Sequence, residues 1–172
     1  SVLGSVPTGE ALSPFLVNHF FLSLEAKWPE KTNNGLMVIS IENLGENNIS
    51  PMRMSLPTPL GWIANPKMTE IPEIPPEGFI EIGVEIKSSG SFSADKMLGR
   101  NLAITTGYLA NYGDLKVQIR VENRTLRNME GIVLDPWLPE GFEAIRLPFV
   151  QNLGPGQKCN LEVDILNVGN NS

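Results

Sequence analysis

Apolar and polar residues alternate along most of this chain, in short runs that are separated by turn residues. In residues 116–121, for example, the apolar Val117, Ile119 and Val121 alternate with Lys, Gln and Arg. A period of two is typical of a β-strand with one buried face, and Gly, Pro and Asn between the runs favour turns. The pattern predicts strands near residues 19–27, 36–43, 50–56, 60–64, 67–74, 79–87, 100–109, 114–123, 129–135, 141–149 and 157–166. It also predicts one helical turn near residues 93–98.

The alternating pattern occurs twice. A shift of 80 residues places Ile41-Glu42-Asn43 on Val121-Glu122-Asn123. The same shift aligns Leu22 and Leu24 with Leu102 and Ile104, Met52 and Met54 with Ile132 and Leu134, and Pro59–Trp62 with Pro139–Phe142; after a one-residue deletion, Ile80, Ile82, Val84 and Ile86 align with Cys159, Leu161, Val163 and Ile165. A period of this length is that of a whole small sandwich. The sequence therefore predicts an all-β protein of two tandem immunoglobulin-like β-sandwiches.

The repeat divides the chain into three segments. Residues 1–18 have no counterpart, residues 19–99 form the first expected domain, and residues 100–172 form the second. The first domain has material for a closing strand in residues 100–110, whereas only seven residues follow Ile165. We therefore expect the second domain to be one strand short, with an open sheet edge that something else covers.

Composition excludes several classes of protein. The net charge of −6 argues against a partner with a nucleic-acid backbone, which requires a basic face. No apolar run approaches the roughly 18 residues of a transmembrane helix, so we expect no membrane insertion. The chain starts at Ser1 without an initiator Met or an apolar signal core, and we expect that a secretion signal has been removed. The single Cys159 rules out an internal disulfide framework.

Side chains capable of catalysis are few and scattered. His19 is the one histidine, and any Ser-His-Asp site or His-ligated metal would have to use it. Cys159 aligns with Ile80 in the inward register, where a cysteine acts as a small hydrophobe. The carboxylates fall in turns and at outward strand positions without the spacing of a glycosidase pair or a calcium loop. We therefore expect no catalytic, cofactor-binding or metal-binding residues, and no enzyme.

Aromatic residues and sequons mark candidate surface sites. Trp62 and Phe142 occupy equivalent positions, which favours packing over stacking on a sugar. Trp137 lies in a Pro-rich loop without a counterpart and is a candidate interface anchor. Three Asn-x-Ser/Thr sequons fall in predicted loops or at the terminus; their acceptors are Asn48, Asn123 and Asn170.

The order of these motifs resembles a known class of surface modules. An Asn follows the second strand, and then come Pro-x-Gly-Trp or Pro-x-Gly-Phe, a Pro-Pro or Gly-Pro-Gly turn, and an alternating strand. This order resembles the CARDB-type and alpha-galactosidase-associated immunoglobulin-like modules of prokaryotic surface proteins. The resemblance covers residues 20–166 and implies the fold, but it carries over no catalytic residue.

The unmatched N-terminal segment suggests a route to assembly. Residues 1–18 are apolar enough to add a strand to the open sandwich of another copy, with Leu12, Phe15, Leu16 and Val17 as interface candidates. Head-to-tail donation of this kind builds an open filament, and in this respect the chain is similar to archaeal thread-type donor-strand filaments. The alternative is that the segment folds back onto its own domain.

These observations favour a secreted structural or adhesive protein of the cell surface. In its more specific form it is a glycoprotein subunit of a self-assembling extracellular filament or pilus, with other copies and other cell-surface proteins as partners. The alternative is an immunoglobulin-like module that binds protein or carbohydrate, either as an accessory domain of a larger surface protein or as an adaptor-type appendage.

Overall fold

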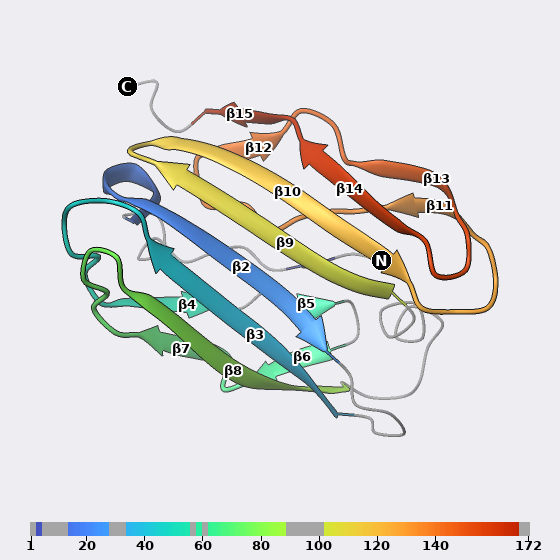
Figure 1. The fold of residues 1–172 in the computed structure, drawn as a ribbon, viewed down its shortest axis with the longest axis horizontal. Helices are drawn as coiled ribbons and strands as arrows, with labels where there is room; N and C mark the ends of the chain where they lie inside the picture. The colour runs from blue at the N-terminus through green and yellow to red at the C-terminus, as the bar shows by residue number, and fades with distance from the viewer. Residues whose placement is uncertain are drawn as a thin grey trace.

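One large sheet runs through both repeats. The computed structural model describes residues 3–4, 14–27, 34–55, 58–59, 62–88 and 102–168, in which strands dominate and residues 14–17 form a short helical turn. Seven strands are hydrogen-bonded in the order β14-β10-β9-β2-β3-β8-β6 (Figure 1). Their bounds are β2 His19–Lys27, β3 Asn34–Asn43, β6 Trp62–Asn65, β8 Phe79–Ser88, β9 Leu102–Asn111, β10 Asp114–Asn123 and β14 Lys158–Val163.

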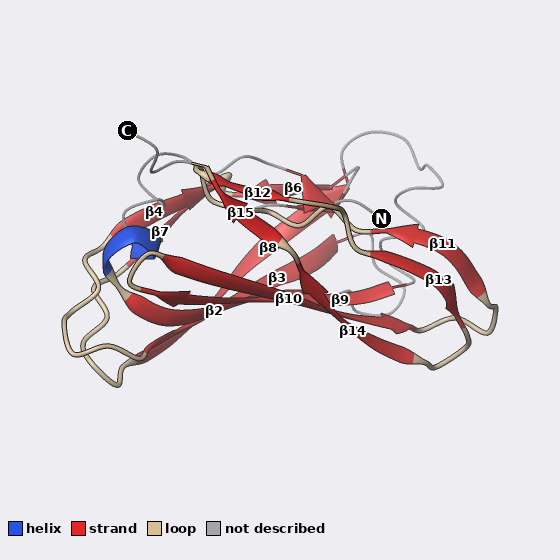
Figure 2. Ribbon diagram, turned by 90° about the horizontal axis from the view of Figure 1, so that it is seen from above, coloured by secondary structure: helices blue, strands red, loops and turns tan. Residues whose placement is uncertain are grey.

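Shorter strands form a second layer on one side of this sheet, so the molecule is sandwich-like (Figure 2). They pair two by two: β1-β5, β4-β7, β11-β13 and β12-β15. Their bounds are β1 Leu3–Gly4, β4 Met52–Ser55, β5 Thr58–Pro59, β7 Met68–Ile71, β11 Met129–Val133, β12 Phe142–Ala144, β13 Phe149–Leu153 and β15 Ile165–Asn167. The all-β class predicted from the alternating pattern is confirmed.

The register of β8 and β14 agrees with the sequence repeat. Ile41 of β3 lies opposite Ile80, and Val121 of β10 lies opposite Cys159. Ile80 and Cys159 are therefore counterparts, as the shift of 80 with its one-residue deletion predicts. Both residues lie at core-facing positions, because the alternation of apolar residues determines which face of each strand is buried.

The register of the first strands differs from the sequence alignment. Phe20 lies opposite Asn43, and Leu102 lies opposite Asn123. Phe20 is therefore the counterpart of Leu102, two residues away from the predicted Leu22. The connection to the next strand is longer in the first repeat, residues 28–33, than in the second, residues 112–113, and an ungapped alignment misses this difference. A shift of two keeps each side chain on the same face of the sheet.

The last strands of the first repeat, β6 and β8, have counterparts in the second repeat. Trp62 of β6 pairs with Ser88 at the end of β8, and Phe142 of β12 pairs with Asn167 of β15. Strands β14 and β15 together thus correspond to β8, which does not match the expectation of a missing strand.

Residues 100–110, expected to close the first repeat, largely form β9. This strand lies between β2 and β10 and is the counterpart of β2. The predicted boundary at residues 99 and 100 lies outside the described residues, as does the helical turn expected at 93–98.

The buried core is also continuous between the repeats. Its centre is a group of rings: Phe15 packs on Phe20 with 5.1 Å between centroids and on Trp137 at 6.0 Å. Tyr108 meets Trp137 edge to face at 5.3 Å. Edge-to-face contacts of this kind are favourable beyond the burial of area alone. Residues from the N-terminal turn, from β2 and from the second repeat thus share one core.

Candidate functional site

Two buried asparagines make the same contacts in the two repeats. Asn43 Nδ2 donates to the carbonyls of Asn47 at 2.8 Å and Ile74 at 2.9 Å. Its Oδ1 accepts from the backbone N–H of Gly45 at 2.9 Å. One side chain therefore closes the loop after its own strand and holds the turn that leads into β8. We call this arrangement the asparagine clasp.

Asn123 forms the second asparagine clasp. Its Nδ2 donates to the carbonyls of Arg127 and Leu153, both at 2.8 Å, and its Oδ1 accepts from Thr125 N–H at 2.9 Å. A fully buried amide whose hydrogen bonds are satisfied specifies one loop conformation. The Asn that the sequence repeat placed after each second strand therefore has a structural role.

This role conflicts with Asn123 as a glycosylation site. The side chain is 0% exposed, and a sugar on Nδ2 would replace one of two N–H donors and would need space inside the core. Thr125, the third residue of the sequon, also belongs to the clasp, because its hydroxyl donates to Asn123 Oδ1 at 2.7 Å. Asn48 is exposed and contacts Glu73 at 3.3 Å, so it remains a candidate acceptor. Asn170 lies outside the described residues.

Trp137 is buried and does not form a surface anchor. It is 1% exposed and packs between Phe15 and Tyr108. Its Pro-rich context predicted an exposed loop, but the ring fills the space beneath the junction of β2 and β9. Among the described residues, none accepts from Trp137 Nε1 or bonds to the Tyr108 hydroxyl. Burial raises the pKa of Tyr108 well above its usual value, because the phenolate would lose its hydration.

The N-terminal interface candidates have different environments. Phe15 is 2% exposed and lies in the chain's own core, whereas Leu16 and Val17 are exposed. Leu12 lies outside the described residues. The turn at 14–17 is held by the β9–β10 hairpin, because Gly113 N–H donates to Phe15 O at 3.1 Å.

Further toward the N-terminus, β1 pairs with β5 of the same chain. In the single chain, the described part of residues 1–18 therefore folds back.

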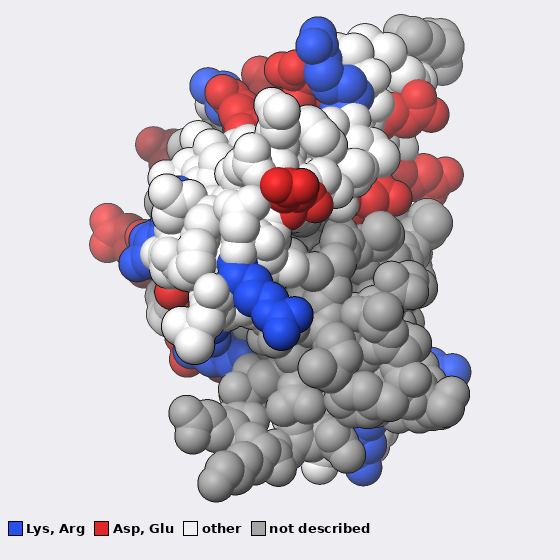
Figure 3. Space-filling model, turned by 90° about the vertical axis from the view of Figure 1, so that its right-hand side faces the viewer, with Lys and Arg blue, Asp and Glu red and all other residues white. Residues whose placement is uncertain are grey.

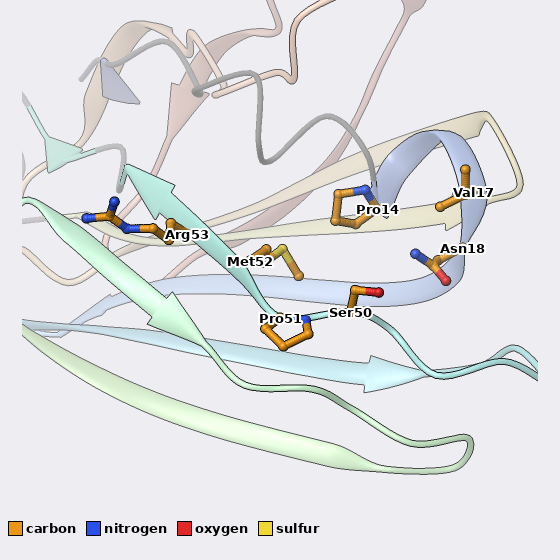
Figure 4. A pocket seen from close by; sticks show the side chains of 7 residues that line it. All are labelled: Pro14, Val17, Asn18, Ser50, Pro51, Met52 and Arg53. Carbon is orange, nitrogen blue, oxygen red and sulfur yellow. The ribbon is translucent and has the colours of Figure 1, made fainter.

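A pocket of about 450 Å³ lies between this turn and the chain leading into β4 (Figure 4). Its lining is largely apolar, with an amide, a hydroxyl and a guanidinium: Pro14, Val17, Asn18, Ser50, Pro51, Met52 and Arg53. Arg53 is also 3.5 Å from Glu70 in an exposed ion pair. The lining offers shape and apolar contact, but no nucleophile with a neighbouring base.

The residues considered for chemistry are separated in the fold. His19 packs on Tyr112 with 5.7 Å between ring centroids, and it lies at the start of β2. Cys159 lies on β14, half-buried on the core-facing side. Within the part of the chain that the structure describes, no group of three or more His, Cys, Asp or Glu residues is close enough to hold a metal ion.

The face of the large sheet opposite the second layer carries mixed charges. A depression of about 380 Å³ is lined by Glu25, Ala103, Thr105, Arg120, Glu122, Arg124 and Lys158. Acidic and basic side chains of the described residues are likewise interspersed at the end of the molecule shown in Figure 3. Neighbouring charges of opposite sign are typical of a solvated surface.

The large sheet ends in strands whose outer edges are unpaired in the described chain. β14 pairs only with β10. β8 pairs with β6 from Glu85 to Ser88, which leaves residues 79–84 without a partner on that side. The core-facing residues at both edges, Ile80 and Ile82 on β8 and Cys159 and Leu161 on β14, are half-buried. The sequence reveals the alternation of these strands but not which of them lie at an edge.

Comparison with known proteins finds no family model and no curated protein that matches the chain. The described helical residues include no segment long and apolar enough to cross a membrane. The fold and the site thus define an all-β, sandwich-like protein with a mixed-charge sheet face and, among its described strands, unpaired sheet edges.

Proposed function

We propose that this chain is a structural or adhesive protein of the cell surface, built from two immunoglobulin-like units joined edge to edge. The counterpart strands and the two asparagine clasps support the view that each repeat is one such unit. The pairing of β2 with β9 makes the two units one continuous scaffold.

The observation that carries this proposal is the large sheet with its unpaired edges. A strand at a sheet edge presents free N–H and C=O groups that can pair with another chain. Half-buried Ile80, Ile82, Cys159 and Leu161 lie at these edges, and an added strand would cover them further. The arrangement favours a protein that joins other subunits through its backbone.

Two routes of assembly follow. The first adds strands at the edges of the large sheet. The second is donation of residues 1–18 to another copy, as in filaments that grow head to tail. Burial of Phe15 in its own core and pairing of β1 with β5 support the first route, because donation would have to break these contacts.

Sedimentation of the full chain beside a variant lacking residues 1–12 tests the assembly. Phe15 is retained in this variant, so the core stays filled. We expect both proteins to form oligomers as concentration rises. Oligomers of the full chain alone would favour strand donation. A chain that stays monomeric at every concentration would favour the alternative of a ligand-binding module.

Location requires a separate test. Antibody labelling of intact source cells should reach the protein without permeabilisation. Labelling that appears only after permeabilisation would contradict a cell-surface role.

A further inference from the structure

The backbone groups that β14 presents at its free edge follow from its pairing with β10. Asn123 N–H donates to Gln157 O at 3.0 Å, and Asn123 O accepts from Gly156 N–H at 2.9 Å, so the opposite residues 123 and 157 occupy the place of a hydrogen-bonded pair at the end of the ladder. Such pairs alternate along an antiparallel ladder. Cys159 and Leu161 therefore bond toward β10, and the N–H and C=O groups of Lys158, Asn160 and Glu162 point away from the sheet.

The same three residues are self-complementary in charge. Two antiparallel copies of β14 related by a twofold axis at Asn160 would place Lys158 of each copy opposite Glu162 of the other. Asn160 would then lie opposite Asn160, and Cys159 opposite Leu161. In this register, the free N–H and C=O groups of one copy face those of the other. Each of the three pairs, 158 with 162, 160 with 160 and 162 with 158, therefore exchanges two backbone hydrogen bonds.

We propose that this protein dimerises by pairing β14 with β14 of a second copy in this register. Opposite charges directly across two strands are stabilising. Among the described residues, neither Lys158 nor Glu162 forms an ion pair; the ion pairs there are Lys27–Glu25, Arg53–Glu70, Lys87–Glu85 and Arg146–Asp164. Pairing would also place Cys159 and Leu161, now half-buried, against each other on the core-facing side.

The molecule already contains one joint of this type. β2 and β9 are counterpart strands that pair antiparallel, and Leu24 lies opposite its own counterpart, Thr106. The two repeats are thus related by an approximate twofold axis through a strand pair. The proposed dimer would repeat this joint at the outer edge of the second repeat (Figure 1).

The other free edge is less suited to self-pairing. Asn43 N–H donates to Gly78 O. By the same alternation, the backbone N–H and C=O groups of Phe79, Glu81 and Gly83 on β8 point away from β3. Pairing about the central residue would place Glu81 opposite Glu81, and like charges in that position are destabilising. β8 therefore serves as an internal control: it is an edge strand with the same outward backbone groups as β14, but self-pairing would bring two like charges together.

This dimer rests on the proposed structural role and gives that role a surface, β14, and a partner, a second copy of the chain. One strand pair is a small interface, which is typical of weak association. We expect a dissociation constant on the order of 10 µM, measured by sedimentation equilibrium of the full chain from about 1 µM to about 1 mM.

Charge reversal tests the register. Lys158→Glu and Glu162→Lys should each raise the dissociation constant about tenfold, because two attractive pairs become repulsive. The double variant restores opposite charges across the strands and should dimerise as the wild type does. Glu81→Lys on β8 is the matched control and should leave the constant unchanged.

Two further variants test the pairing of β14 with β14 directly. Asn160→Pro removes an outward N–H, which an edge strand tolerates, and should abolish the dimer without unfolding the monomer. Leu161→Cys should give a disulfide-linked dimer through Cys159 of the other copy, because residues directly opposite lie within disulfide range.

The outcomes separate this inference from the proposed function. A monomer at every concentration would overturn both the dimer and the role in assembly. Oligomers that are insensitive to all β14 variants but lost without residues 1–12 would overturn β14 pairing and leave the structural role in place. Equal effects of the single and double charge reversals would exclude the proposed register.

Discussion

At the scale of single residues, the clasp asparagines and the buried ring cluster join parts of the chain that are far apart in the sequence. Asn43 and Asn123 use short amides to join a loop to a distant turn in each repeat. Such bonds contribute little net energy each, but removing one partner leaves a buried carbonyl unsatisfied. The two clasps are therefore sites where a small change has a large effect.

Replacing Asn123 by Ala should lower the free energy of unfolding by about 2–3 kcal/mol. The reason is the loss of the donor to the buried Leu153 carbonyl. Urea denaturation followed by circular dichroism measures the change. Asn48→Ala, at an exposed site, is the control and should cost less than about 0.5 kcal/mol. Equal effects of the two substitutions would contradict the clasp.

Tyr108 should make stability depend on alkaline pH. Because its folded-state pKa is raised, the unfolded chain releases this proton first as pH rises above about 10. The contribution of the neutral phenol is present below that pH and is lost as pH increases toward the folded-state pKa. Tyr108→Phe should remove this part of the decline while leaving stability near pH 7 within about 0.5 kcal/mol. Identical pH profiles of the two proteins, measured by urea denaturation, would count against it.

At the scale of elements, the helical turn at residues 14–17 packs against the core-facing side of the sheet. It sends Phe15 into the core and leaves Val17 exposed, and it is held by Tyr112 and Gly113 of the β9–β10 turn. These residues have φ angles of 47° and 101°, as a tight two-residue hairpin requires. The hairpin of the second repeat thus fixes a segment that precedes the first.

Phe15→Ala should lower the free energy of unfolding by about 3–5 kcal/mol, because it leaves a cavity next to Phe20 and Trp137. Val17→Ala, two residues away on the exposed side, should change it by less than about 0.5 kcal/mol. Thermal unfolding of the pair measures the difference. A mild effect of Phe15→Ala would mean that the side chain does not fill its own core.

The alternating sequence pattern predicted where strands occur better than it predicted which strands pair with each other. Alternation fixed which face of β8 and β14 is buried and hence the equivalence of Ile80 and Cys159. It could not show that β2 and β9 pair, because the period of a strand specifies a face and not an adjacent strand. The assignments of Trp137 and Asn123 to the surface failed because Pro-rich context and sequons are local signals, whereas burial is set by distant contacts.

At the scale of the whole molecule, the shared sheet and core make the two repeats one unit. Phe15 contacts both Phe20 of the first repeat and Trp137 of the second, so the ring cluster joins the two repeats. Independent sandwiches would each have a core of their own. The joint between β2 and β9 is therefore the central feature of the structure.

Calorimetry should show one cooperative unfolding transition for the full chain. The physical reason is that neither half can lose its strands without exposing the core of the other. The calorimetric and van't Hoff enthalpies should agree, as they do for a two-state unit. Two resolved transitions would indicate that the repeats unfold separately.

Disulfide trapping tests the central joint most directly. Glu25 of β2 and Thr105 of β9 lie opposite each other, at a separation that a disulfide spans. In a variant with Glu25→Cys, Thr105→Cys and Cys159→Ser, mild oxidation should link the two repeats within one chain. Peptide mapping should then find the two introduced cysteines joined to each other in a protein of monomer mass. Free thiols, or links formed only between chains, would contradict a sheet that runs through both repeats.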